Sequence, residues 1–148
     1  VLLSDETTRR VIKDKRLSVA FFEPGIRNRF NSFFSPLLSK IVSRTTNRLE
    51  GTRTCNMAFW KSDFIKINGF NEDIVGWGRE DTEMAVRLMN TGVKRYNLKL
   101  VGFGYHLFHP ENSREMLSVN DGILSKTISE RLMRCVNGVN KYMALREA

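Results

Sequence analysis

The sequence predicts an α/β domain, an α+β arrangement in which helices flank a small mixed sheet and a helical tail follows. Two observations predict it. The chain has 148 residues, 41% of them hydrophobic and 27% charged, which is typical of one globular domain. Short apolar runs alternate with segments whose apolar residues recur at helical spacing. We expect one domain over residues 1–148, with a helix-rich leading segment (1–53), a core (54–112) and a helical tail (113–148).

The leading segment predicts three elements and a loop. An acidic first turn behind Ser4 indicates a helix over residues 6–15. The apolar run 17–22 predicts a strand, which a Glu-Pro-Gly turn ends. A proline in the first turn favours a helix over residues 36–42. The polar stretch 43–53 predicts a mobile loop.

The core predicts a buried strand over residues 55–60, a short helix over 61–67 that Gly69 ends, and a longer helix over 80–90. A second strand is expected over residues 98–103. The longer helix has an apolar stripe that consists of Met84, Ala85, Leu88 and Met89.

The tail predicts two helices between residues 113 and 147. Four apolar residues indicate the second of them: Leu132, Val136, Val139 and Met143.

The net charge of +8 is unevenly distributed. Residues 71–83 form an acidic island with only Arg79 to offset it, and such an island suits cation binding or proton transfer. The basic remainder favours a polyanionic neighbour such as phospholipid headgroups or nucleic acid, with an ordinary solvated surface as the alternative. The acidic residues of the island are Glu72, Asp73, Glu80, Asp81 and Glu83.

The two cysteines and the hydropathy indicate the cellular compartment. Cys55 and Cys135 lie 80 positions apart and fit neither a disulfide framework nor a zinc motif, so we expect free thiols. No apolar run approaches the ~20 residues that span a bilayer, and the first residues do not resemble a signal peptide. We expect a cytoplasmic protein, with peripheral association with the inner membrane surface as an alternative.

The segment Gly76-Trp77-Gly78-Arg79-Glu80-Asp81 is the first candidate site, where a loop becomes a helix. Acids in a first helical turn stabilise the helix by ~0.3–1 kcal/mol, which is a structural explanation. The two glycines also permit close approach of a ligand, and Trp77 offers a flat ring for a sugar face. The paired carboxylates could divide substrate binding and proton transfer between them.

The two histidines of the chain, His106 and His109, are the second candidate site. On a flat strand, side chains three positions apart point to opposite faces, so both could bind one metal only if a turn intervenes. His109 is the preferred single ligand because Pro110 ends the strand beside it. A divalent ion such as Mn²⁺ fits the carboxylates and histidines better than a zinc–thiolate site.

Four segments together resemble the C-terminal half of GT-A glycosyltransferases, in the galactosyltransferase-type region shared with chondroitin-synthase-like and bacterial family-two enzymes. The resemblance covers about residues 54–112, which makes this core galactosyltransferase-like. The order Asn-x-Ala-Phe, Asn-Gly-Phe, Trp-Gly-x-Glu-Asp, His is specific as a set. The segments are Cys55–Phe64, Asn68–Glu72, Gly76–Asp81 and His106–Pro110.

The resemblance implies a hexosyltransferase of polysaccharide biosynthesis that moves a sugar from a nucleotide-sugar donor to a carbohydrate acceptor with inversion. It makes Asp81 the general base and Glu80 its partner at a sugar. Trp77, in a substrate-binding loop with Gly76, Gly78 and Arg79, would close over the donor. The resemblance makes His109 a ligand of Mn²⁺, and His106 a second ligand. We therefore predict that Glu80, Asp81 and His109 converge on one cleft.

Two features depart from this family. The aspartates of the chain are never two positions apart, so the family's Asp-x-Asp motif for metal and nucleotide is missing. We also expect the family's N-terminal donor-binding half to be missing from this chain. We therefore expect the isolated chain to be inactive, to bind metal weakly or not at all, and to cover exposed apolar side chains by forming a homodimer. These side chains are Leu2, Leu3, Phe21, Phe22, Phe33 and Phe34.

Two rival functions remain at this point. The chain could be a non-catalytic remnant that binds carbohydrate or a partner chain, which the missing Asp-x-Asp favours. It could also be a basic nucleic-acid-binding domain, but nothing in it matches a known groove-reading module, so we expect no nucleic-acid partner. The residues that suggest such a domain are Arg27, Arg29, Phe30, Phe33 and Phe34.

Overall fold

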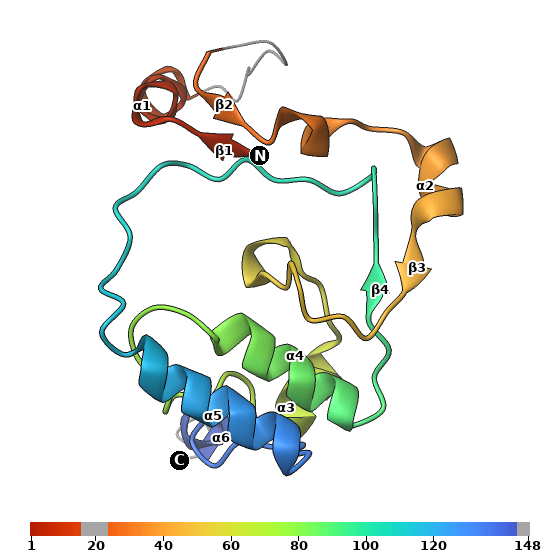
Figure 1. Ribbon diagram of the computed structural model, residues 1–148, viewed down its shortest axis with the longest axis vertical. Helices are drawn as coiled ribbons and strands as arrows, with labels where there is room; N and C mark the ends of the chain where they lie inside the picture. Colours follow the sequence, from red (N-terminus) through yellow and green to blue (C-terminus); the bar gives the residue numbers. More distant parts are fainter. Residues whose placement is uncertain (16–23, 145–148) are drawn as a thin grey trace. The chain divides into compact units, whose positions relative to one another are not determined.

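The computed structural model describes residues 1–15 and 24–144, and the chain divides into two compact units (Figure 1). The first unit comprises residues 1–44 and 96–110, and the second comprises residues 45–95 and 111–148. The strand expected over residues 17–22 lies outside the described residues.

The first unit combines a two-stranded antiparallel sheet with three short helices. Strand β1 (Leu2–Leu3) pairs with β2 (Ile26–Arg27). Helix α1 (Asp5–Asp14) follows β1 directly, and the 3₁₀ helix η1 (Arg29–Ser32) and helix α2 (Pro36–Val42) follow β2. The sheet and α1 lie together at the N-terminal end of the chain (Figure 1).

Helix α1 begins where the sequence predicts because Ser4 caps it. The Ser4 hydroxyl accepts a hydrogen bond from the Thr7 amide at 3.2 Å, as expected of an N-cap. Strand pairing places Leu3 opposite Ile26, and both side chains are buried. The expectation that Leu3 lies exposed is therefore wrong, whereas Phe33 and Phe34 are exposed as expected.

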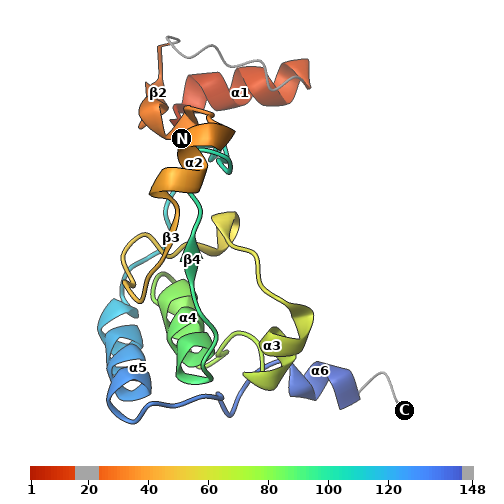
Figure 2. The same cartoon turned by 90° about the vertical axis from the view of Figure 1, so that its right-hand side faces the viewer.

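The second unit is helical. It contains the 3₁₀ helix η2 (Thr54–Asn56) and the helices α3 (Lys61–Lys66), α4 (Glu80–Asn90), α5 (Leu117–Ser129) and α6 (Asn140–Ala144). Helices α4 and α5 pack side by side in both views (Figures 1 and 2). A second two-stranded sheet joins β3 (residues 44–45) and β4 (residues 96–97), where the chain passes from one unit to the other.

The apolar core of the second unit lies under α4. Ile67, Met84 and Leu88 are buried in contact with one another, as the predicted stripe of α4 requires. The partly buried side chains that surround them are Met57, Phe64, Phe70 and Val93.

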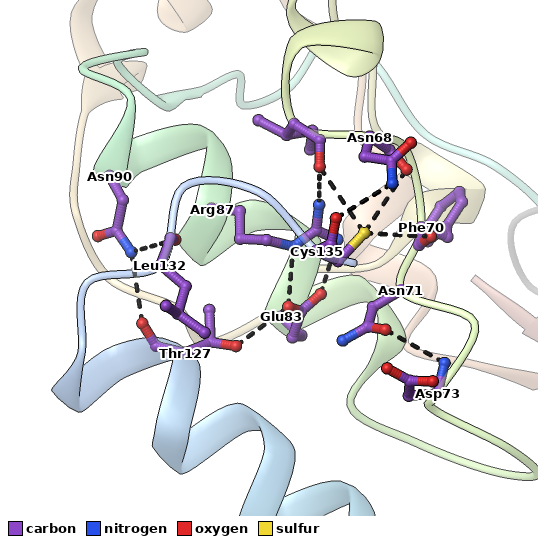
Figure 3. Close-up of polar contacts among 11 residues, drawn as sticks. Asn68, Phe70, Asn71, Asp73, Glu83, Arg87, Asn90, Thr127, Leu132 and Cys135 are labelled. Carbon is purple, nitrogen blue, oxygen red and sulfur yellow. Dashed lines mark hydrogen bonds and ion pairs between the residues drawn. The ribbon is translucent and has the colours of Figure 1, made fainter. Parts of the chain in front are cut away.

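A buried polar network runs beside this core (Figure 3). Glu83 and Arg87 of α4 are fully buried and form an ion pair with two hydrogen bonds of 2.8 and 2.7 Å. Arg87 also donates to the Ile67 carbonyl at 2.6 Å, and the Thr127 hydroxyl of α5 donates to Glu83 at 3.1 Å. Helix α4 is thus joined to α5 and to the chain after α3 by polar contacts as well as apolar ones.

The helices over residues 6–15, 36–42, 61–67 and 80–90 are confirmed within a residue at either end. Their caps and apolar spacing are local properties, which a sequence shows directly. The small sheets among helices agree with the predicted α/β class.

The strands expected over residues 55–60 and 98–103 are wrong. Trp60 is 76% exposed and Leu98 is 52% exposed. Neither segment pairs with another strand among the described residues, and an apolar run becomes a strand only where its backbone finds a partner.

The tail was predicted only in part. Helix α5 is where it was expected, but the second helix is reduced to α6, and Val136 is 88% exposed rather than on a helical apolar face. Within the described residues, no helix has both the length and the hydropathy needed to cross a bilayer.

Candidate active site

The loop before α4 follows an unusual backbone path. Gly76, Gly78 and Arg79 have φ angles of 77°, 95° and 82°, so three of four consecutive residues are left-handed. A Cβ on Gly78 would lie 3.2 Å from a methyl carbon of Leu117. Glycine is favoured at position 78, because only glycine combines this φ with this contact at low cost. The approach of a ligand to the loop stays a prediction.

Asn120 of α5 holds this loop in place. Its side chain is fully buried, and its Nδ2 donates to the carbonyls of Val75 at 3.0 Å and Gly78 at 3.1 Å. The Trp77 carbonyl lies at 3.4 Å from the same nitrogen. Among the described residues, the buried Oδ1 of Asn120 has no hydrogen-bond partner. One buried amide therefore contacts three backbone carbonyls of the loop.

Sequence reasoning missed Asn120, although one signal was available. Asparagine is unfavourable in a helix interior because its side chain competes for backbone groups, and Asn120 lies in the first turns of a predicted helix. The next residue, Asp121, forms an ion pair with Arg79. Helix α5 thus contacts the loop backbone through Asn120 and the Arg79 side chain through Asp121.

Trp77 remains accessible, with 36% of its surface exposed. The guanidinium carbon of Arg114 lies 4.3 Å from the Trp77 ring centroid, in cation–π contact. Glu111 accepts a hydrogen bond from Arg114 at 2.6 Å and orients it. The indole is therefore held in a defined position and still offers surface to a ligand.

The two carboxylates at the start of α4 have different surroundings. Asp81 is half-buried, and its Oδ1 accepts a hydrogen bond from the Thr54 hydroxyl at 2.6 Å. Glu80 is also half-buried, and its Oε2 is a buried atom with no partner in the described part of the chain. A buried acceptor without a donor costs ~1–3 kcal/mol.

The acidic island is smaller than the sequence suggests. Glu83 is neutralised by Arg87 in the core, and Glu72 pairs with Lys141 on the surface. The Lys141 ammonium holds the pKa of Glu72 below its ordinary value. Asp73 accepts a hydrogen bond from the Asn137 side chain at 2.7 Å on the surface. Glu80 and Asp81 are the pair of carboxylates at the start of α4.

The two histidines belong to the first unit and lie beside each other. Their ring centroids are 5.0 Å apart. The backbone of His106 bonds to Val1 and Leu3, whereas His109 lies beyond this pairing with Nδ1 3.0 Å from the Pro110 carbonyl. The chain is irregular between them, so the flat-strand geometry that would point the two rings to opposite faces does not apply.

These histidines supply at most part of a metal site. No group of three or more His, Cys, Asp or Glu side chains that could hold a metal occurs within residues 1–15 and 24–144. Glu80 and Asp81 belong to the second unit and His109 to the first. The convergence of the three on one cleft stays a prediction, as does Mn²⁺ binding.

Both cysteines are free thiols, as expected. Cys55 is exposed, whereas Cys135 is buried beside the carbonyls of Ile67 and Asn68. Burial raises the pKa of the Cys135 thiol, so this residue is structural rather than nucleophilic.

A turn that presents a tryptophan beside paired carboxylates is compatible with a sugar-handling enzyme. Residues 35–110, just over half of the 148-residue chain, match the family described as the N-terminal domain of galactosyltransferase, and the chain belongs to this family. The sequence-based resemblance to glycosyltransferases is thereby confirmed.

Curated relatives are glycosyltransferases as well. Human chondroitin sulfate synthase 3 is 35% identical over 51 residues, which are 34% of this chain and 6% of that protein. Validoxylamine A glucosyltransferase of Streptomyces hygroscopicus subsp. jinggangensis is 42% identical over 40 residues, which are 27% of this chain and 10% of that protein. The chain thus spans a tenth or less of the length of these relatives. No solved structure matches it.

Proposed function

We propose that the chain forms the acceptor side of a GT-A glycosyltransferase, which moves a hexose from a nucleotide-sugar donor to a carbohydrate acceptor. One observation carries this proposal: Glu80 and Asp81 begin a helix directly after an accessible tryptophan whose loop is fixed by a buried side chain. Membership of the family and the glycosyltransferase relatives support sugar transfer.

Asp81 is assigned the role of general base. Thr54 holds Oδ1, and Oδ2 has no protein donor among the described residues, so Oδ2 is free to take a proton from an acceptor hydroxyl. The acceptor oxygen then attacks the anomeric carbon of the donor sugar. The bond from that carbon to the nucleoside diphosphate breaks, and its electron pair departs with the diphosphate. A single displacement of this kind inverts the anomeric carbon.

Glu80 and Trp77 are assigned to sugar binding. The buried Oε2 of Glu80 lacks a donor, and a sugar hydroxyl would supply one. The exposed part of the Trp77 ring suits the apolar face of a hexose, while Arg114 keeps the ring in place. Because the described residues do not form a three-ligand metal site, no step is assigned to a metal.

Carbohydrate binding without transfer is the second candidate. It is favoured by the absence of an Asp-x-Asp sequence from the 148 residues. The tryptophan and the unpartnered carboxylate oxygen would serve this function equally well. The two candidates differ in whether nucleoside diphosphate is released when both sugars are bound.

A matched pair of tryptophan variants tests the proposal. Full-length protein is incubated with a panel of nucleotide sugars and oligosaccharide acceptors, and acceptor-dependent release of nucleoside diphosphate is measured. Trp77→Ala is expected to lower kcat/KM by about tenfold or more, equivalent to ~1.4 kcal/mol of transition-state binding. Trp60→Ala is the control, because Trp60 is 76% exposed and lies outside the site.

Two results would contradict the proposal. Equal losses from both variants would remove Trp77 from the site. Acceptor binding that depends on Trp77, without nucleoside diphosphate release from any donor, would favour the non-catalytic candidate instead.

A further inference from the structure

Helix α2 is turned with its polar side inward. Ser39 is 4% exposed, whereas Leu37 is 74% and Ile41 is 76% exposed. Leu38 and Val42, one position further along, are 44% and 46% exposed. A helix on a protein surface normally buries its apolar stripe. Helix α2 does the opposite and exposes its apolar side.

The cause is a row of serines at four-residue spacing. The Ser35 amide donates to the Leu100 carbonyl at 2.8 Å, and the Ser43 hydroxyl accepts from the Lys99 amide at 2.9 Å. Ser39 lies between them and its hydroxyl is 3.1 Å from that of Ser43. These contacts all lie within the first unit, and they fix the serine side of α2 against residues 99–100. The apolar side must then face outward.

Two phenylalanines before the helix extend this surface. Phe33 is 52% exposed and Phe34 is 59% exposed. We define the α2 apolar face as the six residues Phe33, Phe34, Leu37, Leu38, Ile41 and Val42. Large exposed apolar patches on a folded protein mark interaction sites.

The charged residues of the segment that contains the α2 apolar face all have one sign. Residues 24–44 contain no Asp or Glu. Their four cations form no ion pair with a described residue, so a partner with negative charge would complement them. These cations are Arg27, Arg29, Lys40 and Arg44.

We propose that the α2 apolar face docks on an anionic phospholipid surface. The six apolar side chains would enter the boundary between headgroups and acyl chains, and the four cations would contact lipid phosphates. A symmetric dimer through this face would bring two sets of like charges together. Nucleic acid would satisfy the cations, but the leucine and isoleucine side chains cannot stack on bases. The inference goes beyond sugar transfer and does not depend on it.

The test is sedimentation of the 148-residue chain with phosphatidylcholine vesicles that contain or lack phosphatidylglycerol. We expect binding only to the anionic vesicles, and we expect salt to weaken it. A variant with Phe33→Ser, Phe34→Ser, Leu37→Ser and Ile41→Ser should lose binding. Its control is Met133→Ser with Val136→Ser, which removes exposed apolar side chains of the second unit.

A charge variant tests the other half of the proposal. Each basic residue near an anionic membrane contributes about fivefold to binding, so replacing all four cations by Gln should weaken binding by about a hundredfold or more. The control replaces four exposed lysines of the second unit, and it should bind like the wild type. These lysines are Lys61, Lys66, Lys94 and Lys126.

Three outcomes would overturn the proposal. Equal vesicle binding by the serine and glutamine variants and by their controls would mean nonspecific attraction of a basic protein. Absence of vesicle binding, with a lower thermal midpoint for the serine variant, would mean that the face packs within the chain. Absence of vesicle binding, with self-association that the serine variant abolishes, would mean that a second copy covers it.

Discussion

Helix α4 turns its apolar side inward, whereas helix α2 turns its apolar side outward. Helix α4 buries a full ion pair, Glu83 and Arg87, beside its apolar stripe. Helix α2 exposes four large apolar side chains and buries a serine. Both were predicted as helices from their local pattern, and both are helices. The difference lies in which face each helix turns inward.

Polar partners decide which face of each helix turns inward. Arg87 reaches the Ile67 carbonyl and Glu83 reaches Thr127, so the polar groups of α4 are satisfied inside. The two serines that flank α2, Ser35 and Ser43, find backbone partners at residues 99–100. Apolar periodicity predicts a helix, but the partners that satisfy its polar groups come from segments far away in the sequence.

The largest expected effect is the loss of one partner from the buried ion pair. Arg87→Met leaves the Glu83 carboxylate buried without a cation, which we expect to cost ~3–5 kcal/mol of unfolding free energy. Chemical denaturation measures it. The control is Arg9→Met, because Arg9 and Asp5 form an exposed pair at the same i,i+4 spacing, where a loss of ~0.3–0.5 kcal/mol is expected. Comparable losses would show that α4 does not depend on its buried pair.

A second pair of variants truncates one apolar side chain in each of the two helices. Met84→Ala in α4 should cost ~2–5 kcal/mol, because Met84 is fully buried in the core. Ile41→Ala in α2 should change stability by less than ~0.5 kcal/mol, because Ile41 is 76% exposed. A large loss from Ile41→Ala would mean that the α2 apolar face is covered within the folded chain.

A third variant tests whether Asn120 holds the loop of residues 76–79 in place. Asn120→Ala removes the donor shared by the Val75, Trp77 and Gly78 carbonyls, at a cost of ~1–3 kcal/mol. Hydrogen exchange at residues 76–79 should accelerate relative to the wild type. Asn90→Ala is the control, since Asn90 donates to the Leu132 carbonyl away from the loop. Unchanged exchange at residues 76–79 in Asn120→Ala would contradict the role of Asn120.

The smallest effect concerns the surface pair of Glu72 and Lys141. The hydrogen bond from Lys141 lowers the pKa of Glu72, and the same bond raises the pKa of Lys141. The contribution of Glu72 is therefore present above its unfolded pKa and lost as the pH falls through its lowered folded pKa. In Glu72→Gln, the thermal midpoint should therefore fall slightly less than in the wild type as the pH is lowered. An unchanged pH profile would show that the pair contributes nothing measurable.

The sequence predicts the parts of the fold that depend on neighbouring residues. Ser4, the proline at the start of α2 and the glycines of the loop before α4 act locally, and the elements around them are confirmed. The expected strands failed because strand formation depends on a partner that local pattern does not specify. Cys55–Trp60 has strand composition but no pairing among the described residues.

In the candidate site, too, the sequence predicts what is local and not the partners that are distant along the chain. Trp77, Glu80 and Asp81 were identified from their motif, and the structure places them together at the start of α4. Their supports were not identified: Thr54 lies 27 residues from Asp81, and Asn120 lies 43 residues from Trp77. They are ordinary polar residues whose roles appear only when the chain is folded.

The role of Asp81 as the base is the central claim, and turnover of Asp81→Asn in the full-length protein tests it most directly. The control is Asp63→Asn, because Asp63 is also a first-turn acid, in α3, outside the site. A positioned base contributes about 10²–10⁴-fold, whereas a first-turn acid contributes at most ~1 kcal/mol to stability. We predict that kcat falls by at least a hundredfold, on the order expected for a base, in Asp81→Asn only, while both variants fold normally. Near-normal kcat in Asp81→Asn would contradict the assignment of Asp81 as the base.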